Sequence, residues 1–360
     1  MFKVNIEPHW RISKQGGDDF DATTLLQLLT EIHGHRSITT AAKNVGLSYR
    51  HVWGLLQTAE ATLGFKLLDA QRGRGADLTE LAKTLLWADR LIGARLSPTL
   101  QTLASELESE LQRVTALAGP ETDAALRLHA SHGFAEAALL EALAAAEVRV
   151  ELGYRHSSEA VASLARGECD MAGFHVPLGE FEKPAIERYR QWLDPRKHVL
   201  VHLALRSQGM FLPRGNPRKI RGLEDLVQPR LKFVNRQAGS GTRLLIDMML
   251  AKAGLDSSAI QGFDTAEFTH AAVAAHVASG MADVGIGVET AARRFGLDFL
   301  PLLQERYFFA VDKKALKRYP VNRTVELIRS PAYKEQVRAL RGYDAASTGL
   351  IQTLSEAFPD

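Results

Sequence analysis

One segment of the chain carries the groups that proteins use to hold a small anion. NRQAGSGTR, residues 235–243, stands between a β-prone run, LKFVN, and an apolar helical run, LLIDMMLAKAG. Ser240 and Thr242 offer hydroxyl groups, Gly241 allows close approach to the backbone, and a helix start adds free N–H groups at the positive end of the helix dipole. Arg243 adds a charged donor that suits a carboxylate. We therefore predict an anion site, although simple capping of the helix by Ser240 uses the same residues.

Polar residues also adjoin other β-prone runs in this part of the chain. They are Ser131 and His132 after LRLHA, Ser157 after VRVELGY, His175 at the end of DMAGFH, and Thr269 and His270 at the start of the helix before ADVGIGV. In an open α/β fold such junctions share the carboxyl edge of the sheet, where ligands bind. We expect these residues to converge with residues 240–243 on one anion. Each junction alone also fits an ordinary helix cap, and His175 fits a buried structural role.

A second set of residues has the pattern of a DNA-reading unit. In SITTAAKNVGLSYRHVWGLL, residues 37–56, Ala41 belongs to the apolar face of one helix, Gly46 supplies a turn, and Ser48 caps the next helix. Two helices joined in this way form a helix-turn-helix, whose second helix contacts DNA from its N-terminal end. Trp53 on that helix fits either a core position or a contact with DNA. An ordinary helical hairpin is the alternative.

The residues that follow have the composition of a wing. LLDAQRGRGADLT reads as strand, glycine-arginine loop and strand, which places Arg72 and Arg74 at the loop tip, within reach of phosphates or a minor groove. Basic residues outnumber acidic ones here, so the segment is locally positive in a chain whose net charge is only +2. The predicted DNA contacts are Arg36, Lys43, Ser48, Tyr49, Arg50, His51, Arg72 and Arg74.

The two sets of residues fall in parts of the chain with different textures. Apolar residues recur at helical spacing over residues 20–117, whereas short β-prone runs alternate with alanine-rich helical stretches further on. The alternation predicts parallel strands with crossover helices. We therefore expect a multidomain chain: an all-α winged helix-turn-helix (1–78), a long linker helix (79–121), and an α/β domain of two lobes (122–360).

The linker segment carries an apolar stripe that must be buried against something. Its members are Leu81, Leu85, Ala88, Ile92, Leu96, Leu100, Leu103, Leu107, Leu111 and Val114. We favour pairing with a second copy of the chain, in a homo-oligomer of two or four subunits, over an internal core contact. Pro98 either kinks a continuous helix or begins a new one with Ser97 as its cap.

Composition and missing motifs narrow the classes of function. The chain is 46% hydrophobic and 24% charged, as folded proteins are, and its single cysteine, Cys169, excludes an internal disulfide. The first 20 residues lack a signal-peptide pattern and no run spans a bilayer, so we expect a cytoplasmic protein without membrane contact. Gly-x-Ser-x-Gly, His-Glu-x-x-His, CxxC and P-loop motifs are missing, so we expect no enzyme, no metal site and no cofactor.

The stretch SITTAAKNVGLSYRHVWGLL followed by LLDAQRGRGADLT resembles the N-terminal domain of the molybdate-responsive ModE regulators and, more distantly, of the LysR-type regulators. The resemblance covers roughly the first third of the chain and includes the LSYR start of the second helix. It implies a dimer that reads an inverted repeat in double-stranded DNA, with a long helix at the dimer seam. The wing of this chain departs from the usual ModE wing, which is longer and richer in glycine.

Beyond residue 120 the element order and the NRQAGSGTR motif resemble the type II periplasmic-binding-protein fold, not the small β-barrel modules of ModE proteins. The chain is expected to cross between the lobes near 203–212 and 307–312, which would supply a hinge. The resemblance implies a ligand-responsive transcriptional regulator whose effector is molybdate or tungstate. A small carboxylate such as formate is the alternative effector. A small-molecule-binding protein without a DNA role, or an enzyme, is the remote alternative.

Overall fold

The structure is a computed structural model that describes residues 4–13, 19–71, 75–116 and 125–359. The chain forms two compact units, Glu7–Gly93 and Met1–Ile6 with Ala94–Asp360. In the described ranges, no helix combines the length and the apolar character that a membrane crossing needs.

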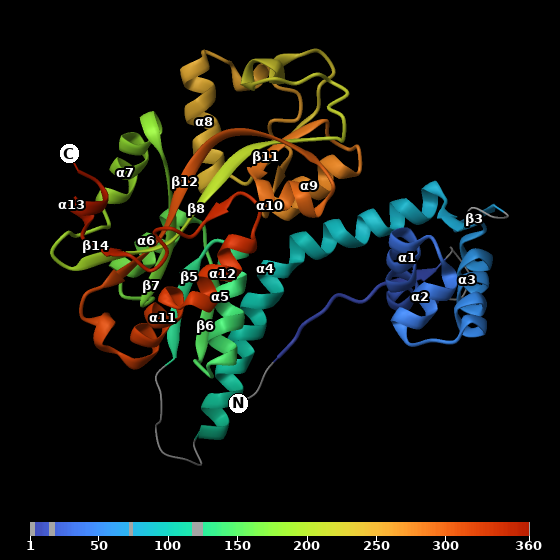
Figure 1. The fold of residues 1–360 in the computed structure, drawn as a ribbon, viewed down its shortest axis with the longest axis horizontal. Coiled ribbons are helices and arrows are strands. Elements are labelled where there is room, and N and C mark those ends of the chain that lie inside the picture. Colours follow the sequence, from blue (N-terminus) through green and yellow to red (C-terminus); the bar gives the residue numbers. More distant parts are fainter. Residues whose placement is uncertain (1–3, 14–18, 72–74, 117–124, 360) are drawn as a thin grey trace. The chain divides into compact units, whose positions relative to one another are not determined.

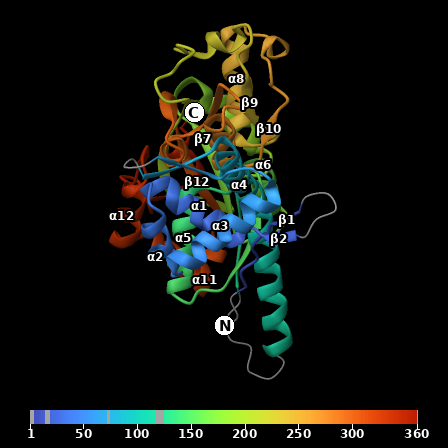
Figure 2. The same ribbon diagram turned by 90° about the vertical axis from the view of Figure 1, so that its right-hand side faces the viewer.

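The first unit is a winged helix-turn-helix. Its elements are β1 (Arg11–Ser13), β2 (Asp19–Asp21), α1 (Thr23–His35), α2 (Ile38–Val45), α3 (Tyr49–Leu63), β3 (Leu68–Gln71), β4 (Gly75–Leu78) and the first part of α4 (Glu80–Ala116). The helices α1, α2 and α3 pack around one core, to which α1 contributes the fully buried Leu25, Leu29 and Ile32 (Figures 1 and 2). The hairpin β3–β4 is the predicted wing. The hairpin β1–β2 was not predicted.

Local sequence explains where the two helices of the helix-turn-helix begin and end. Ser37 caps α2 by accepting a hydrogen bond from the backbone N–H of Thr40 at 3.2 Å. Ser48 caps α3 in the same way, with the N–H of His51 at 3.2 Å. Gly46 ends α2 with a φ of +75°, a region that side chains other than glycine rarely adopt. The predicted helix-turn-helix is therefore present.

The second unit is an α/β domain. Its strands are β5 (Leu126–Ala130), β6 (Val150–Tyr154), β7 (Met171–Pro177), β8 (His198–Leu212), β9 (Phe233–Arg236), β10 (Ala266–Glu267), β11 (Val284–Val288), β12 (Asp298–Asp312), β13 (Tyr343–Asp344) and β14 (Ile351–Gln352). Its helices after α4 are α5 (Phe134–Ala145), α6 (Ser157–Ala165), α7 (Glu182–Arg190), α8 (Gly241–Ala253), α9 (His270–Ala278), α10 (Glu289–Arg294), α11 (Tyr319–Arg329), α12 (Pro331–Ala339) and α13 (Leu354–Ala357).

The strands form one sheet in the order β10-β9-β11-β8-β12-β7-β5-β6, with β13 and β14 paired to β8. The predicted parallel pairs are present: β5 with β6 and β7, and β9 with β10 and β11. The two groups form two lobes, and helices cover both faces of the sheet in each (Figure 1). This arrangement is the expected two-lobed α/β fold.

Two long antiparallel strands, β8 and β12, pass from one lobe to the other. On β8 the change of neighbours falls near Gln208, where pairing with β11 begins, inside the predicted crossing. On β12 the change of neighbouring strands falls between Pro301 and Glu305, at a register shift. It therefore precedes the predicted crossing at residues 307–312. That prediction was wrong because residues 307–311 pair with β7 inside one lobe.

The helix α4 runs without interruption through Pro98, so no new helix begins there. Its second half lies along β6, the strand at one edge of the sheet (Figure 1). The Ser105 hydroxyl donates to the Val150 carbonyl at 3.2 Å and accepts from the Leu152 N–H at 2.8 Å. Side chains of α4 thereby satisfy backbone groups that an edge strand leaves open.

Candidate functional site

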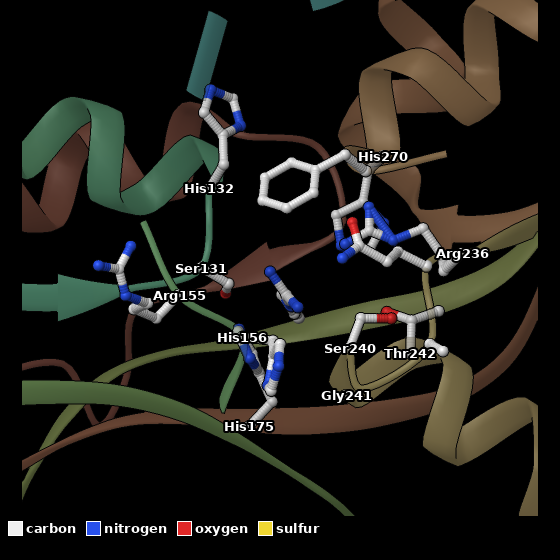
Figure 3. A pocket seen from close by; sticks show the side chains of 14 residues that line it. Ser131, His132, Arg155, His156, His175, Arg236, Ser240, Gly241, Thr242 and His270 are labelled. Carbon is white, nitrogen blue, oxygen red and sulfur yellow. The ribbon is translucent and has the colours of Figure 1, made fainter. Parts of the chain in front are cut away.

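A cavity of about 30 Å³ lies where strands of both lobes end and helices begin. Its lining residues are Ser131, His132, Arg155, His156, His175, Arg206, Arg236, Gln237, Ala238, Ser240, Gly241, Thr242, Phe268 and His270. Figure 3 shows Ser131, His132 and Arg155 on one side, with Arg236, Ser240 and Thr242 on the other. A cavity of this size suits a ligand of a few heavy atoms.

The most unusual group in the cavity is the guanidinium of Arg236, the last residue of β9. The side chain is 5% exposed, and its Nε and Nη1 atoms find no hydrogen-bond partner among the described residues. Burial and the nearby Arg206 lower the pKa of Arg236 to about 9, so the group is still protonated at neutral pH. A buried cation without a partner is costly, and no carboxylate lines the cavity to offset it.

Arg206, the other buried arginine of the cavity, is by contrast satisfied within the protein. Its Nε donates to the carboxylate of Glu305 at 2.6 Å, and both side chains are nearly fully buried. Although burial acts to lower it, Glu305 raises the pKa of Arg206 above its usual range. The charge of Arg206 is therefore neutralised by Glu305, whereas the guanidinium of Arg236 has no such ion pair.

Three histidines of the cavity wall are neutral donors or acceptors. Burial lowers the pKa of His132 to about 4, and holds the pKa values of His175 and His270 well below their usual range. His175 Nε2 and His270 Nδ1 are buried without a hydrogen-bond partner among the described residues. Unsatisfied buried polar atoms are rare in proteins, so their gathering here makes the cavity the candidate functional site.

The hydroxyl groups at the start of α8 are oriented by the protein. Ser240 Oγ caps the helix by accepting from the N–H of Arg243 at 3.2 Å, and Thr242 Oγ1 accepts from Gln208 Nε2 at 3.0 Å. Because each oxygen already accepts a hydrogen bond, each hydroxyl proton is free to point into the cavity. Capping and anion binding, the two interpretations of this motif, are thus compatible.

The structure brings seven of the ten predicted ligand residues to the cavity wall: Ser131, His132, His175, Ser240, Gly241, Thr242 and His270. Three are placed elsewhere. The Arg243 guanidinium pairs with Asp247 at 2.9 Å and lies over a phenylalanine ring. Ser157 lies behind the wall, 3.3 Å from His175 Nδ1. The Thr269 hydroxyl bonds to α4 instead.

Sequence patterns missed six polar or aromatic residues of the wall: Arg155, His156, Arg206, Arg236, Gln237 and Phe268. Arg236 lies inside the NRQAGSGTR motif, directly at the strand end, and its position was itself a signal. Arg206 is a lone cation in the apolar run HVLVHLAL…GMFL, and this isolation was a second signal in the sequence.

The recognition helix α3 presents polar and aromatic side chains at its N-terminal end. Tyr49, Arg50 and His51 are exposed, as is Lys43 on α2. Trp53 is 43% exposed and stacks on Tyr49, with ring centroids 6.3 Å apart, so it is no core residue.

Two other predicted DNA contacts, Ser48 and Arg36, already have partners within the protein. Ser48 acts as the cap of α3. Arg36 is exposed but forms an ion pair with Asp77 on β4, which ties the base of the wing to the helices. Arg72 and Arg74 lie outside the described residues.

We expect the two buried arginines to respond in opposite ways to replacement by methionine. Arg236→Met removes an unpaired buried charge and should raise the free energy of unfolding by about 1–2 kcal/mol. Arg206→Met leaves Glu305 buried without its partner and should lower it by about 3–5 kcal/mol. Urea unfolding of both variants measures this, and destabilisation by Arg236→Met would contradict a ligand-binding role for that residue.

Comparison with known proteins assigns both units. A model of the PBP superfamily domain matches residues 140–329, and a model of the lysR family of bacterial regulatory helix-turn-helix proteins matches residues 23–83. The uncharacterized protein YvgK of Bacillus subtilis is 31% identical over 201 residues, or 55% of this chain and 64% of YvgK. The chain thus spans less than two thirds of that relative.

A second relative is matched by this chain over almost its full length. An uncharacterized Clostridium pasteurianum protein from the 5′ region of a ferredoxin 2Fe-2S gene is 34% identical over 111 residues, 31% of this chain and 98% of that protein.

Two solved structures resemble this chain at low sequence identity. A mutant of Corynebacterium glutamicum OxyR is 16% identical, with a TM-score of 0.42, and covers 89% of this chain and 95% of its own. Full-length BenM is 16% identical, with a TM-score of 0.41, and covers 84% and 94%. These scores are too low to carry residue positions over. Because the PBP match covers more than half of the chain, the protein belongs to the PBP superfamily and carries a LysR-type helix-turn-helix domain ahead of its two lobes.

Proposed function

We propose that the protein is a ligand-responsive transcriptional regulator, in which the helix-turn-helix binds double-stranded DNA and the cavity binds a small anion. The unpaired guanidinium of Arg236, buried in a cavity without a carboxylate, is the observation that carries the anion. The match to the lysR family model supports the DNA role and favours a regulator over an enzyme. For a protein with this role we expect a cytoplasmic location.

The donors around the cavity favour a tetrahedral oxyanion such as molybdate or tungstate. They come from junctions on both lobes, so an anion with oxygen atoms on every side can use more of them than a planar ion can. Formate or another small carboxylate is the second candidate, because Arg236 can bind two oxygen atoms at once. The helix starts at Ser240 and His270 add backbone N–H groups to either.

Isothermal titration calorimetry of the full-length protein against molybdate, tungstate, sulfate, phosphate and formate tests the ligand class. We expect molybdate and tungstate to bind most tightly. Arg236→Met should weaken binding roughly 10- to 100-fold, the effect of a lost charged hydrogen bond. Arg243→Met is the matched control and should bind as the wild type does, because Arg243 faces away from the cavity. Binding of none of these ions would refute the proposed ligand.

The exposed end of α3 supports contact with base edges. Arg50 can bond to guanine or to phosphate, and the stacked rings of Tyr49 and Trp53 offer an apolar surface that suits the methyl group of thymine. A dimer would present two such helices to an inverted repeat.

Replacement of Arg50 by alanine should weaken DNA binding by about 1–3 kcal/mol because a charged contact is lost. The measurement is a fluorescence-anisotropy titration with a duplex selected by the wild-type protein from a random pool, repeated at several salt concentrations. Arg338→Ala, which removes an exposed arginine of α12, is the control and should leave the affinity unchanged. Equal affinity of Arg50→Ala and the wild type would count against this helix as the reader.

The apolar stripe of α4 supports a homodimer. Leu96, Leu103, Leu107 and Val114 are between 39% and 55% exposed. Their spacing of seven, four and seven residues is that of the seam of a coiled coil. The opposite side of the helix holds the edge of the sheet through Ser105.

Paired substitutions Leu103→Glu and Leu107→Glu should shift the protein toward monomer, because two charges would be buried at the seam. Sedimentation velocity measures the shift, and circular dichroism checks that the helices remain. Thr99→Glu introduces a charge at an exposed position of the same helix and serves as the control. A doubly substituted chain that sediments as the wild type does would exclude this face as the interface.

A further inference from the structure

The helix α4 contains a proline, and a residue next to the cavity wall bonds the backbone carbonyl that this proline leaves without a partner. Pro98 has no N–H group, so the carbonyl of Ala94, four residues earlier, loses its partner within the helix. The hydroxyl of Thr269 donates a hydrogen bond to this carbonyl at 3.1 Å. A residue that lies 175 positions along the chain therefore supports α4 at its weakest point.

Thr269 is held in place by its own helix. It is 1% exposed and caps α9 by accepting from the N–H of Ala272 at 2.9 Å. Its oxygen is thus occupied as an acceptor, and its proton is left for Ala94. The residues on either side of it, Phe268 and His270, line the anion cavity.

An ion pair at Arg95, the residue after Ala94, strengthens this contact between α4 and the segment around Thr269. Arg95 donates through Nε to the carboxylate of Glu267 at 2.7 Å, and its Nη2 bonds the other oxygen. His276 Nδ1 lies 3.0 Å from that carboxylate, which is 2% exposed. Despite the opposing effect of burial, these bonds lower the pKa of Glu267, so the pair is ionised at neutral pH.

The ion pair is also connected to the unpaired arginine. Glu267 on β10 and Arg236 on β9 are register partners in adjacent strands. The backbone N–H of Gln237, a lining residue, donates to the carbonyl of Glu267 at 3.0 Å. An anion that binds Arg236 therefore acts directly beside the group that holds Arg95.

We propose that residues 267–270 form a latch that reports anion occupancy to α4. Within the latch the residues alternate, because Phe268 and His270 face the anion whereas Glu267 and Thr269 hold α4. The inference rests on the proposed function.

The boundary between the two compact units falls between Gly93 and Ala94, beside the latch. The second half of α4 is bonded to the other lobe through Ser105. When the anion draws the lobes together, the support of α4 at Pro98 changes, and this alters the DNA affinity. Such coupling requires that the anion bind the two states of the latch with different affinity.

The test compares DNA affinity of the full-length chain with and without saturating molybdate or tungstate, while calorimetry follows binding of the ion. The wild-type ratio should lie in the usual range for coupled sites, roughly 5- to 150-fold. Thr269→Val keeps the shape of the side chain but removes the hydroxyl, and should bring the ratio to within about twofold of one. Thr269→Ser keeps the hydroxyl and should retain the wild-type ratio.

Three further variants separate the effect of the latch from effects on folding and on helix capping. Arg95→Ala changes a residue on the helix side of the latch, so it should reduce the ratio while the anion still binds. Arg293→Ala removes an ion pair within α10 of the same lobe and should leave the ratio unchanged. Pro98→Ala restores the helical N–H for Ala94, so adding Thr269→Val to it should have little further effect on the ratio.

Wild-type ratios in both Thr269→Val and Arg95→Ala, with the anion still bound, would overturn the latch and leave the proposed function standing. If the wild-type protein binds none of the ions, or if the ions do not change its DNA affinity, both the proposed function and the latch would be overturned.

Discussion

The buried guanidinium of Arg236 is the constraint on which the account of this protein depends. An unpaired charge out of contact with water destabilises a folded chain unless something neutralises it. Glu305 and Glu267 attract this charge from nearby, but Glu305 bonds to Arg206, and Glu267 bonds to Arg95 and His276. Burial keeps the neighbouring histidines neutral, so they neither repel nor neutralise the arginine. The unpaired charge of Arg236 is therefore the basis of the proposal that an anion binds in the cavity.

The fold places this charge where it can be used. Parallel strands of each lobe end at the cavity, and the helix starts that follow bring hydroxyl and backbone N–H groups to it from both sides. The long strands β8 and β12 connect the lobes, and α4 is bonded to both. The same helix begins in the helix-turn-helix unit, so we propose that a ligand held between the lobes acts on it.

Local signals in the sequence predicted the features that neighbouring residues determine. Gly46 and Ser48 marked the helix-turn-helix because a positive φ and a helix cap are decided within a few residues. The serines and histidines at strand ends were likewise predicted near the cavity. Arg243 was the predicted arginine, but its guanidinium pairs with Asp247 on α8, whereas Arg236, at the strand end, lines the cavity.

Features that depend on distant parts of the chain escaped prediction. The exposure of Trp53 depends on which face of α3 packs against α1, which the sequence of α3 alone does not reveal. Thr269 was predicted as a ligand residue, but its hydroxyl bonds to Ala94, and no local pattern predicts a contact between segments so far apart in the chain.

We propose above all that an anion bound to Arg236 changes DNA binding. The most direct test of this proposal is an anisotropy titration of DNA with the wild type and Arg236→Met, each with and without molybdate. The account predicts that molybdate shifts the wild-type curve and leaves the variant's curve in place. Equal shifts in both proteins would contradict it.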